Sequence, residues 1–131
     1  MRTEEQKARR KAKSIEYVQK YRQTHRKELI ARQQDYYQSL RIEVLTYYGG
    51  SKLACVKCGF SNPNALCIDH INNDGANHRR LLGISTGYET ILWLFREGFP
   101  EGFQTLCCNC NTIKKRLADN KIKSLPGIGG L

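Results

Sequence analysis

The N-terminal part of the chain lacks residues that break helices, because residues 3–48 contain no glycine and no proline. Glutamate, glutamine, lysine, alanine and arginine, which favour helices, dominate this segment. Its apolar side chains recur at roughly helical spacing. Residues 1–48 are therefore predicted to form a basic helical arm, either as one helix or as two with a break near Thr24 and His25. The alternative for residues 1–25 is a partly disordered arm that folds only on a partner.

Long apolar runs are also missing. The longest uninterrupted run, Ile91 to Phe95, is far shorter than the roughly 20 residues that a membrane-spanning helix needs. The N-terminus is charged from Arg2 onward, and no apolar segment of a signal peptide follows it. We therefore expect an intracellular protein with no membrane partner. Thiols stay reduced inside cells, so paired cysteines favour a metal over a disulfide.

Acidic residues are scarce: 12 Asp and Glu stand against 22 Lys and Arg, for a net charge of +10. The positive charge is concentrated at the two ends. Residues 1–48 carry a net +6, residues 49–103 carry none, and residues 104–131 carry +4. This asymmetry favours nucleic acid as the partner, held by the ends and acted on by the middle. The alternative is a basic surface that serves solubility.

Six cysteines compensate for a thin core. With 131 residues, 40% of them apolar, the chain fits one domain with an arm or tail. Such a small core usually needs a staple, that is, a cross-link such as a disulfide or a structural metal ion. Four of the cysteines form two Cys-x-x-Cys pairs, Cys55/Cys58 and Cys107/Cys110. Each pair can span one edge of a tetrahedron, which predicts a closed, structural Zn²⁺ site. Cys67 is expected to point inward from a strand. Cys108 could replace Cys107 only by compressing the second pair to Cys-x-Cys.

A second constellation combines a carboxylate, an imidazole and an amide. Asp69 and His70 follow a short predicted strand, and Asn111 directly follows the last zinc cysteine. Asp69 and Asn111 offer the oxygen ligands that Mg²⁺ or Mn²⁺ prefers, and a neutral His70 can take a proton from water. These residues are predicted to hydrolyse phosphodiester bonds. Because strand side chains alternate, a bend or bulge is needed to bring Asp69 and His70 to one substrate. The alternative is a turn residue beside a structural histidine.

The region 49–120 is predicted to form the domain, and residues 121–131 a flexible tail. The domain should contain, in order, a strand at 65–68, a polar loop at 72–80, a helix at about 86–97 capped by Ser85 or Thr86, a strand at 103–106, and a helix ending near residue 119.

These residues resemble the HNH endonucleases of the ββα-metal fold, in particular a four-cysteine, phage-type subgroup that includes a Holliday-junction resolvase. The resemblance covers about residues 44–116 and rests on four segments: Cys55-x2-Cys58, Asp69-His70-Ile71, Leu106-Cys107-x2-Cys110-Asn111, and Lys114-Lys115. It implies a small α+β, zinc-stapled ββα-metal (HNH) domain with a long helical N-terminal extension. It also implies double-stranded DNA as substrate and the cytoplasm of a bacterial or phage-infected cell as location.

By this resemblance His70 is the general base, and Asp69 and Asn111 hold the divalent ion. Many members of the family carry an asparagine that orients the catalytic histidine, and this chain has Gly102 at that position. We therefore expect Asn72 or Asn73, or the backbone alone, to hold His70.

Other side chains are candidates for DNA contacts. Phosphate contacts are expected from Arg79, Arg80, Lys114, Lys115 and Arg116. His78 should contact phosphate or support His70, unless it is an exposed loop histidine.

Two other functions stay open, a non-catalytic zinc-stapled DNA-binding module and a DNA-junction resolvase. A double-strand cut would normally call for two sites, which the arm could provide by forming a homodimer.

Overall fold

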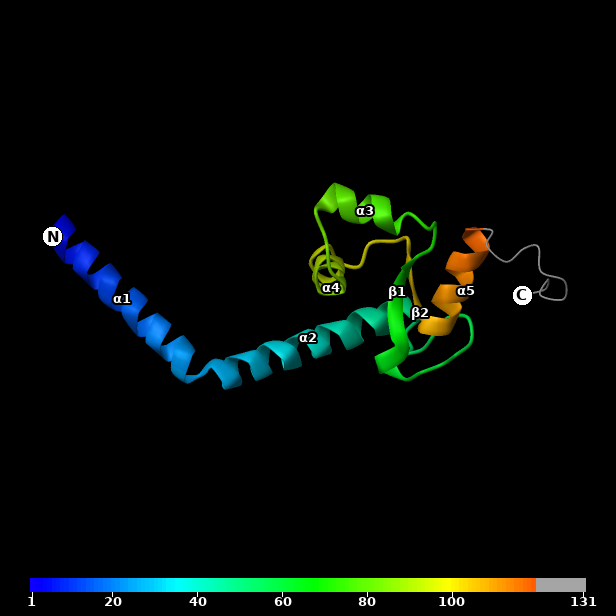
Figure 1. Cartoon of the computed structure of the whole chain (residues 1–131), viewed down its shortest axis with the longest axis horizontal. Helices are drawn as coiled ribbons and strands as arrows, with labels where there is room; N and C mark the ends of the chain where they lie inside the picture. Colours follow the sequence, from blue (N-terminus) through cyan, green and yellow to red (C-terminus); the bar gives the residue numbers. More distant parts are fainter. Residues whose placement is uncertain (120–131) are drawn as a thin grey trace. The chain divides into compact units, whose positions relative to one another are not determined.

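The computed structural model describes residues 1–119, so the predicted tail at 121–131 lies outside the described residues. The elements, shown in Figure 1, are α1 (Glu4–Thr24), α2 (Arg26–Tyr48), the 3-10 turn η1 (Pro63–Ala65), β1 (Leu66–His70), α3 (Gly75–Leu82), α4 (Gly87–Arg96), β2 (Phe103–Cys107) and α5 (Cys108–Ala118). In this described part of the chain, five α-helices and one two-stranded sheet confirm the α+β class. Within residues 1–119, no helix is long and apolar enough to cross a membrane.

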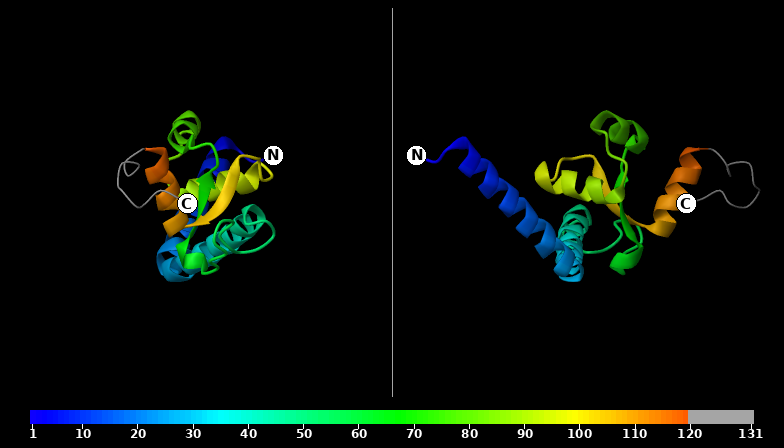
Figure 2. Two further views of the ribbon diagram at one scale, coloured as in Figure 1. Left: turned by 90° about the vertical axis from the view of Figure 1, so that its right-hand side faces the viewer. Right: turned by 60° about the vertical axis from the view of Figure 1, so that its left-hand side comes forward.

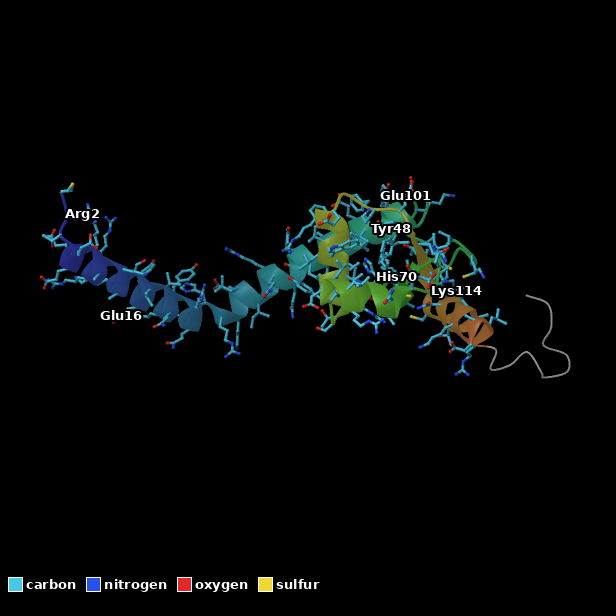
Figure 3. All side chains as sticks on the ribbon, turned by 90° about the horizontal axis from the view of Figure 1, so that it is seen from above. Arg2, Glu16, Tyr48, His70, Glu101 and Lys114 are labelled. Carbon is cyan, nitrogen blue, oxygen red and sulfur yellow. The ribbon has the colours of Figure 1, made fainter. Side chains whose placement is uncertain are left out.

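The chain divides into two compact units, residues 1–37 and the part from Gln38 onward. In the first unit the helical arm breaks at His25, as the two-helix alternative predicts. A capping box starts α1, since the Thr3 hydroxyl accepts from the backbone N–H of Gln6 and the Gln6 side chain accepts from that of Thr3. No residue of α1 is buried, and Figure 3 shows its side chains projecting all round the helix. The second helix, α2, crosses the division and belongs to both units.

The C-terminal half of α2 is anchored in the second unit by its apolar face. Leu40, Val44 and Tyr48, four residues apart, are buried on one stripe of the helix. The fully buried Thr105 donates a hydrogen bond from its hydroxyl to the carbonyl of Leu45, at 2.7 Å. The Tyr48 hydroxyl donates to a backbone carbonyl at 2.6 Å, and burial is the main reason why the pKa of Tyr48 rises to about 12. This half of α2 is therefore part of the core.

The two strands pair antiparallel, from Leu66 opposite Cys107 to His70 opposite Phe103. Both predicted strands are confirmed, and β1 continues to His70, two residues beyond the predicted end. Figures 1 and 2 show α5 on one side of this two-stranded sheet and α3 with α4 on the other. Because side chains alternate along a strand, the two sides carry different residues, and this separation determines how the site is built.

The helices between the strands correct one prediction. The predicted helix at 86–97 is α4, which begins with a capping box of Thr86 and Glu89. The predicted polar loop at 72–80 is mostly wrong, because Gly75–Leu82 forms α3. This short helix has no buried residue, so no apolar stripe marks it. Asp74 at its N-cap and Gly83, which ends the helix with a positive φ of 67°, were the sequence signals available, although the Asp74 side chain makes no capping hydrogen bond.

Candidate metal centre and polar site

The four paired cysteines meet at one point. The sulfur atoms of Cys55, Cys58, Cys107 and Cys110 all lie within 4.8 Å of one another. A tetrahedral Zn²⁺ with Zn–S bonds of about 2.3 Å places its sulfurs about 3.8 Å apart, so this cluster could hold a structural ion such as zinc. Cys108 is exposed outside the cluster, so the alternative Cys-x-Cys pairing is not used.

The electrostatics of the thiols favour a cation. Burial raises the pKa of Cys55, but the backbone amides of Cys107, Cys58 and Lys57 more than offset this effect and bring the pKa to about 6. The pKa of Cys110 is raised to about 12, mainly by its contact with Cys107 and also by burial. Four thiols at this spacing cannot all ionise beside one another, whereas a bound divalent ion stabilises all four thiolates. The donor set therefore fits the predicted metal.

Asp69 lies on the α5 side of β1, where its carboxylate meets an ammonium group. Its Oδ2 accepts hydrogen bonds from Nζ of Lys114 and from Nε2 of Gln104, both at 2.8 Å. The side chains of Asp69 and Lys114 are only 10% and 16% exposed. Lys114 also donates to the carbonyl of His70 at 2.7 Å and to Oδ1 of Asn73 at 2.8 Å. Each of its three ammonium hydrogens thus has a protein acceptor, whereas the sequence predicted a phosphate contact.

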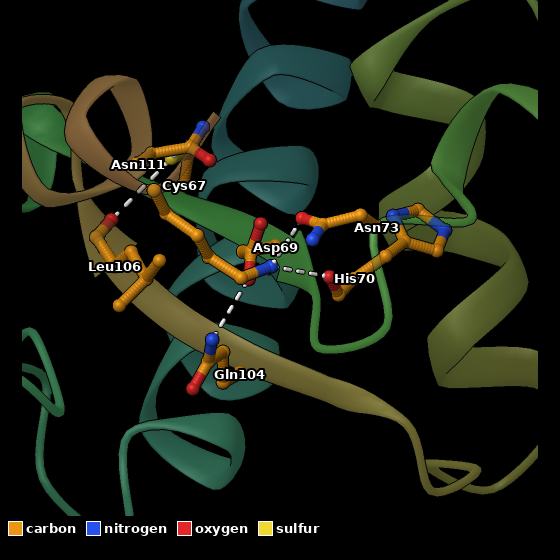
Figure 4. Close-up of polar contacts among 8 residues, drawn as sticks. Cys67, Asp69, His70, Asn73, Gln104, Leu106 and Asn111 are labelled. Carbon is orange, nitrogen blue, oxygen red and sulfur yellow. Dashed lines mark hydrogen bonds and ion pairs between the residues drawn. The ribbon is translucent and has the colours of Figure 1, made fainter. Parts of the chain in front are cut away.

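Asn111 occupies the first turn of α5, on the same side of β1 as Asp69 (Figure 4). Its Nδ2 donates to the sulfur of Cys67 at 3.3 Å. Cys67 precedes Asp69 by two residues in the strand, and Asn111 precedes Lys114 by three in the helix, so the two contacts line up β1 and α5. This is the structural role of Cys67, which is half-buried as a strand residue.

The oxygens of Asp69 and Asn111 have the right chemistry for a hard divalent ion. Asn111 uses its nitrogen for Cys67, which leaves the amide oxygen for other ligands. The carboxylate of Asp69 already holds the ammonium of Lys114. The residues therefore fit an ion in type, but such an ion would have to share the carboxylate with Lys114 or replace it.

His70 lies on the other side of β1 from Asp69, and its ring points away from the carboxylate (Figure 4). The register is regular to the strand end, without the predicted bend or bulge. Nε2 of His70 lies 3.2 Å from Nδ1 of His78, and the His70 ring lies against Phe103 with 4.8 Å between ring centroids. His78 in turn lies against Trp93 at 4.7 Å. The structure therefore gives His78 a place beside His70 and not in an exposed loop.

The environment keeps His70 neutral. Burial is the largest cause that lowers the pKa of His70, and the charge of His78 lowers it further, against the opposite effect of Asp74. Packing at the ring is tight, since a Cβ on Gly75 would lie 2.9 Å from Nδ1 of His70. Glycine is required at this start of α3 because any side chain would push against the imidazole. A neutral, half-buried imidazole can accept a proton.

The turn after β1 is held by the backbone and by Lys114. The N–H of Ile71 donates to the carbonyl of Gly102, and that of Asn73 donates to the carbonyl of His70, both at 3.0 Å. Asn73 has a left-handed φ of 59°, and its side chain accepts from Lys114. Of the two asparagines expected to hold His70, both are exposed, and Asn73 hydrogen-bonds the backbone of His70. Gly102 contributes a carbonyl where an asparagine side chain was expected.

The remaining basic candidates lie at the surface. Arg79 and Arg80 are exposed on α3, and Lys115 and Arg116 are exposed on α5, so all four are available to a partner.

Comparisons with protein-family models, with curated proteins and with solved structures gave no match to this chain. The interpretation of the site therefore rests on its own residues.

Several residues of the site were not found from the sequence. Gln104 lies directly opposite Asp69, and Phe103 directly opposite His70, so the strand register places one partner beside each. The alternation of side chains along β2 could have suggested these two cross-strand pairs. The register between β1 and β2, however, depends on the connection between the strands and on the packing of the core. The contact between Trp93 and His78 depends on how α4 packs, which no local sequence pattern determines.

Proposed function

We propose that this protein is a metal-dependent DNA endonuclease of the HNH type, which hydrolyses phosphodiester bonds in double-stranded DNA. The observation that carries the proposal is the state of His70. Its imidazole is half-buried at the end of β1, and its pKa is lowered mainly by burial. Because β1 has no bend, His70 and Asp69 lie on opposite faces, so the scissile phosphate would have to lie at the end of the strand, between the two side chains. A histidine that is neutral at neutral pH is suited to take a proton from an attacking water.

In this proposal His70 and His78 act as a pair. His70 accepts the proton of the attacking water at Nδ1, while its Nε2–H donates to Nδ1 of His78 at 3.2 Å. The hydrogen bond fixes the tautomer of His70 and so leaves Nδ1 as the nitrogen that accepts the proton. The ring of Phe103 packs against His70 and that of Trp93 against His78, which helps to hold the two imidazoles in place.

Two metal ions have separate roles. Zinc on the four cysteines is structural, since four thiolates leave no open coordination position. A divalent ion held by Asp69 and Asn111 would supply positive charge at the scissile phosphate and its leaving oxygen. The zinc cluster supports this arrangement, because Cys107 caps the start of α5, the helix that carries Asn111 and Lys114.

The charge distribution supports a nucleic-acid substrate. The net charge is +10, and exposed arginine and lysine side chains lie on α3 and α5 beside the site residues. Binding that depends on phosphate contacts releases counterions, so the affinity should fall steeply with salt.

The proposal is tested with supercoiled plasmid DNA. The zinc-loaded protein is incubated with plasmid without added metal, with Mg²⁺ and with Mn²⁺, and zinc content is measured after each reaction. Nicked or linear product that requires added metal supports a nuclease. If no metal gives product while the protein still shifts DNA in a gel, the protein is a binding module.

One observation favours that second candidate, a non-catalytic zinc-stapled DNA-binding module. The ammonium of Lys114 already neutralises the carboxylate of Asp69. With this partner the carboxylate does not need a divalent ion to balance its charge. A junction resolvase is a narrower form of the nuclease proposal. Synthetic four-way junctions compared with a matched linear duplex test it, and equal cleavage of both argues against junction selectivity.

A further inference from the structure

The ammonium of Lys114 is surrounded by three oxygens of different kinds. They are the carboxylate Oδ2 of Asp69 at 2.8 Å, the carbonyl of His70 at 2.7 Å and the amide Oδ1 of Asn73 at 2.8 Å. Carboxylate, backbone carbonyl and amide oxygens are also the ligands of hard divalent cations in proteins. The group of three oxygens has the composition of a cation site, and a lysine fills it.

We propose that these three oxygens form a divalent-cation site in which Lys114 is the internal counter-ion, and that an ion enters only by displacing the ammonium. This site shares Asp69 with the predicted pair of Asp69 and Asn111, and differs from that pair because its other oxygens come from the carbonyl of His70 and the side chain of Asn73. Its role in DNA cleavage rests on the proposed function, whereas its affinity for cations does not.

Displacement is physically reasonable because the oxygens are already arranged by other contacts. Gln104 holds Oδ2 of Asp69, and the N–H of Asn73 holds the carbonyl of His70. An ion that replaces the ammonium would therefore find a preformed turn, so that little ordering has to accompany binding. The long side chain of Lys114, once displaced, can reach a phosphate oxygen. Binding of the ion would then free Lys114 to form a phosphate contact.

The wild-type protein provides a direct test. Lysine side chains are acetylated briefly with and without Mg²⁺, and each site is quantified by mass spectrometry. The exposed Lys115 on the same helix is the internal reference. The proposal predicts slow labelling of Lys114 without Mg²⁺ and labelling several-fold faster with it, at constant labelling of Lys115. A Lys114 rate that does not respond to Mg²⁺ overturns the proposal.

A second test measures Mn²⁺ affinity by electron paramagnetic resonance. Lys114→Met removes the competing ammonium, so its Mn²⁺ affinity should rise by about tenfold. Lys52→Met, at an exposed position of the same unit, removes one charge without touching the three oxygens and should change the affinity by less than about twofold. Lys114→Gln serves where the methionine variant loses zinc. Equal affinities of the Lys114 and Lys52 variants overturn the proposal, as does the absence of Mn²⁺ binding to every variant.

Failure of this inference is distinct from failure of the proposed function. A protein that cuts DNA with metal but shows no effect of Lys114 on Mn²⁺ binding is a nuclease without this device. A protein that never cuts DNA but binds Mn²⁺ more tightly after Lys114→Met has the cation site without the nuclease activity. Asp69→Asn should abolish Mn²⁺ binding in either case, because it removes the only carboxylate among the three oxygens.

Discussion

Nε2 of His70 and Nδ1 of His78 face each other across 3.2 Å, on the opposite side of β1 from the ion pair of Asp69 and Lys114. His70 lies at the end of β1, and His78 lies on α3, about one turn after its first residue, Gly75. The two faces of a single strand thus present an imidazole pair and a charged cluster. This arrangement separates the candidate base from the candidate cation site, and it makes His78 part of any account of His70.

The first prediction concerns pH. Since the pKa of His70 is lowered, mainly by burial and then by His78, the wild-type protein should keep cleaving DNA below the ordinary histidine pKa of about 6.5. His78→Ala removes the electrostatic effect of His78 and admits water, and both changes raise the pKa of His70. The acid limb of the cleavage rate profile should therefore move to higher pH. His25→Ala, which changes a histidine of the arm, is the control, and equal limbs in all three proteins would contradict the pairing.

The second prediction concerns the cysteine cluster. Cys107→Ser should reduce bound zinc well below one per chain, because structural zinc sites provide on the order of 10 kcal/mol of apparent binding energy that supports the fold. The domain should then lose its cooperative unfolding transition. Cys108→Ser changes an exposed cysteine next to it and should keep both properties. Zinc is measured by mass spectrometry and unfolding by circular dichroism. A stable, zinc-free Cys107→Ser domain would show that the cluster is not the staple.

The third prediction concerns the arm. Deleting residues 1–24 removes α1, which has no buried residue, so the melting temperature of the second unit should not change. The affinity for duplex DNA should fall, and the plot of log affinity against log salt should become shallower by about 0.9 for each phosphate contact that is lost. Fluorescence anisotropy at several salt concentrations measures both quantities. An unchanged slope would exclude the arm as a source of phosphate contacts.

The sequence predicted those parts of the structure that depend on local patterns. The Cys-x-x-Cys spacing identified all four members of the cluster, because each pair chelates locally and the chain only has to bring two pairs together. The absence of glycine and proline predicted the helical arm, and the Thr86 cap predicted α4. The short α3 was missed because it buries no side chain, so its pattern differs little from that of a polar loop.

The interior of the site could not be predicted in the same way. The sequence predicts a phosphate contact for Lys114, because it stands in a basic run on an amphipathic helix. Its contacts within the protein depend on how α5 lies along β1, which is determined by the contact of Asn111 with Cys67 and by the cysteine cluster. Contacts between distant segments depend on packing and register, and no window of sequence contains them.

The central claim, that His70 is the general base of a nuclease, is tested most directly by one comparison. The single-turnover rate of plasmid cleavage in Mg²⁺ is measured for the wild type and for His70→Ala, with zinc content and circular dichroism confirming that both are folded. The account predicts that the rate falls by about 10² to 10⁴-fold, the usual contribution of a general base, while DNA binding persists. A folded, zinc-loaded His70→Ala protein that cuts at the wild-type rate would contradict it.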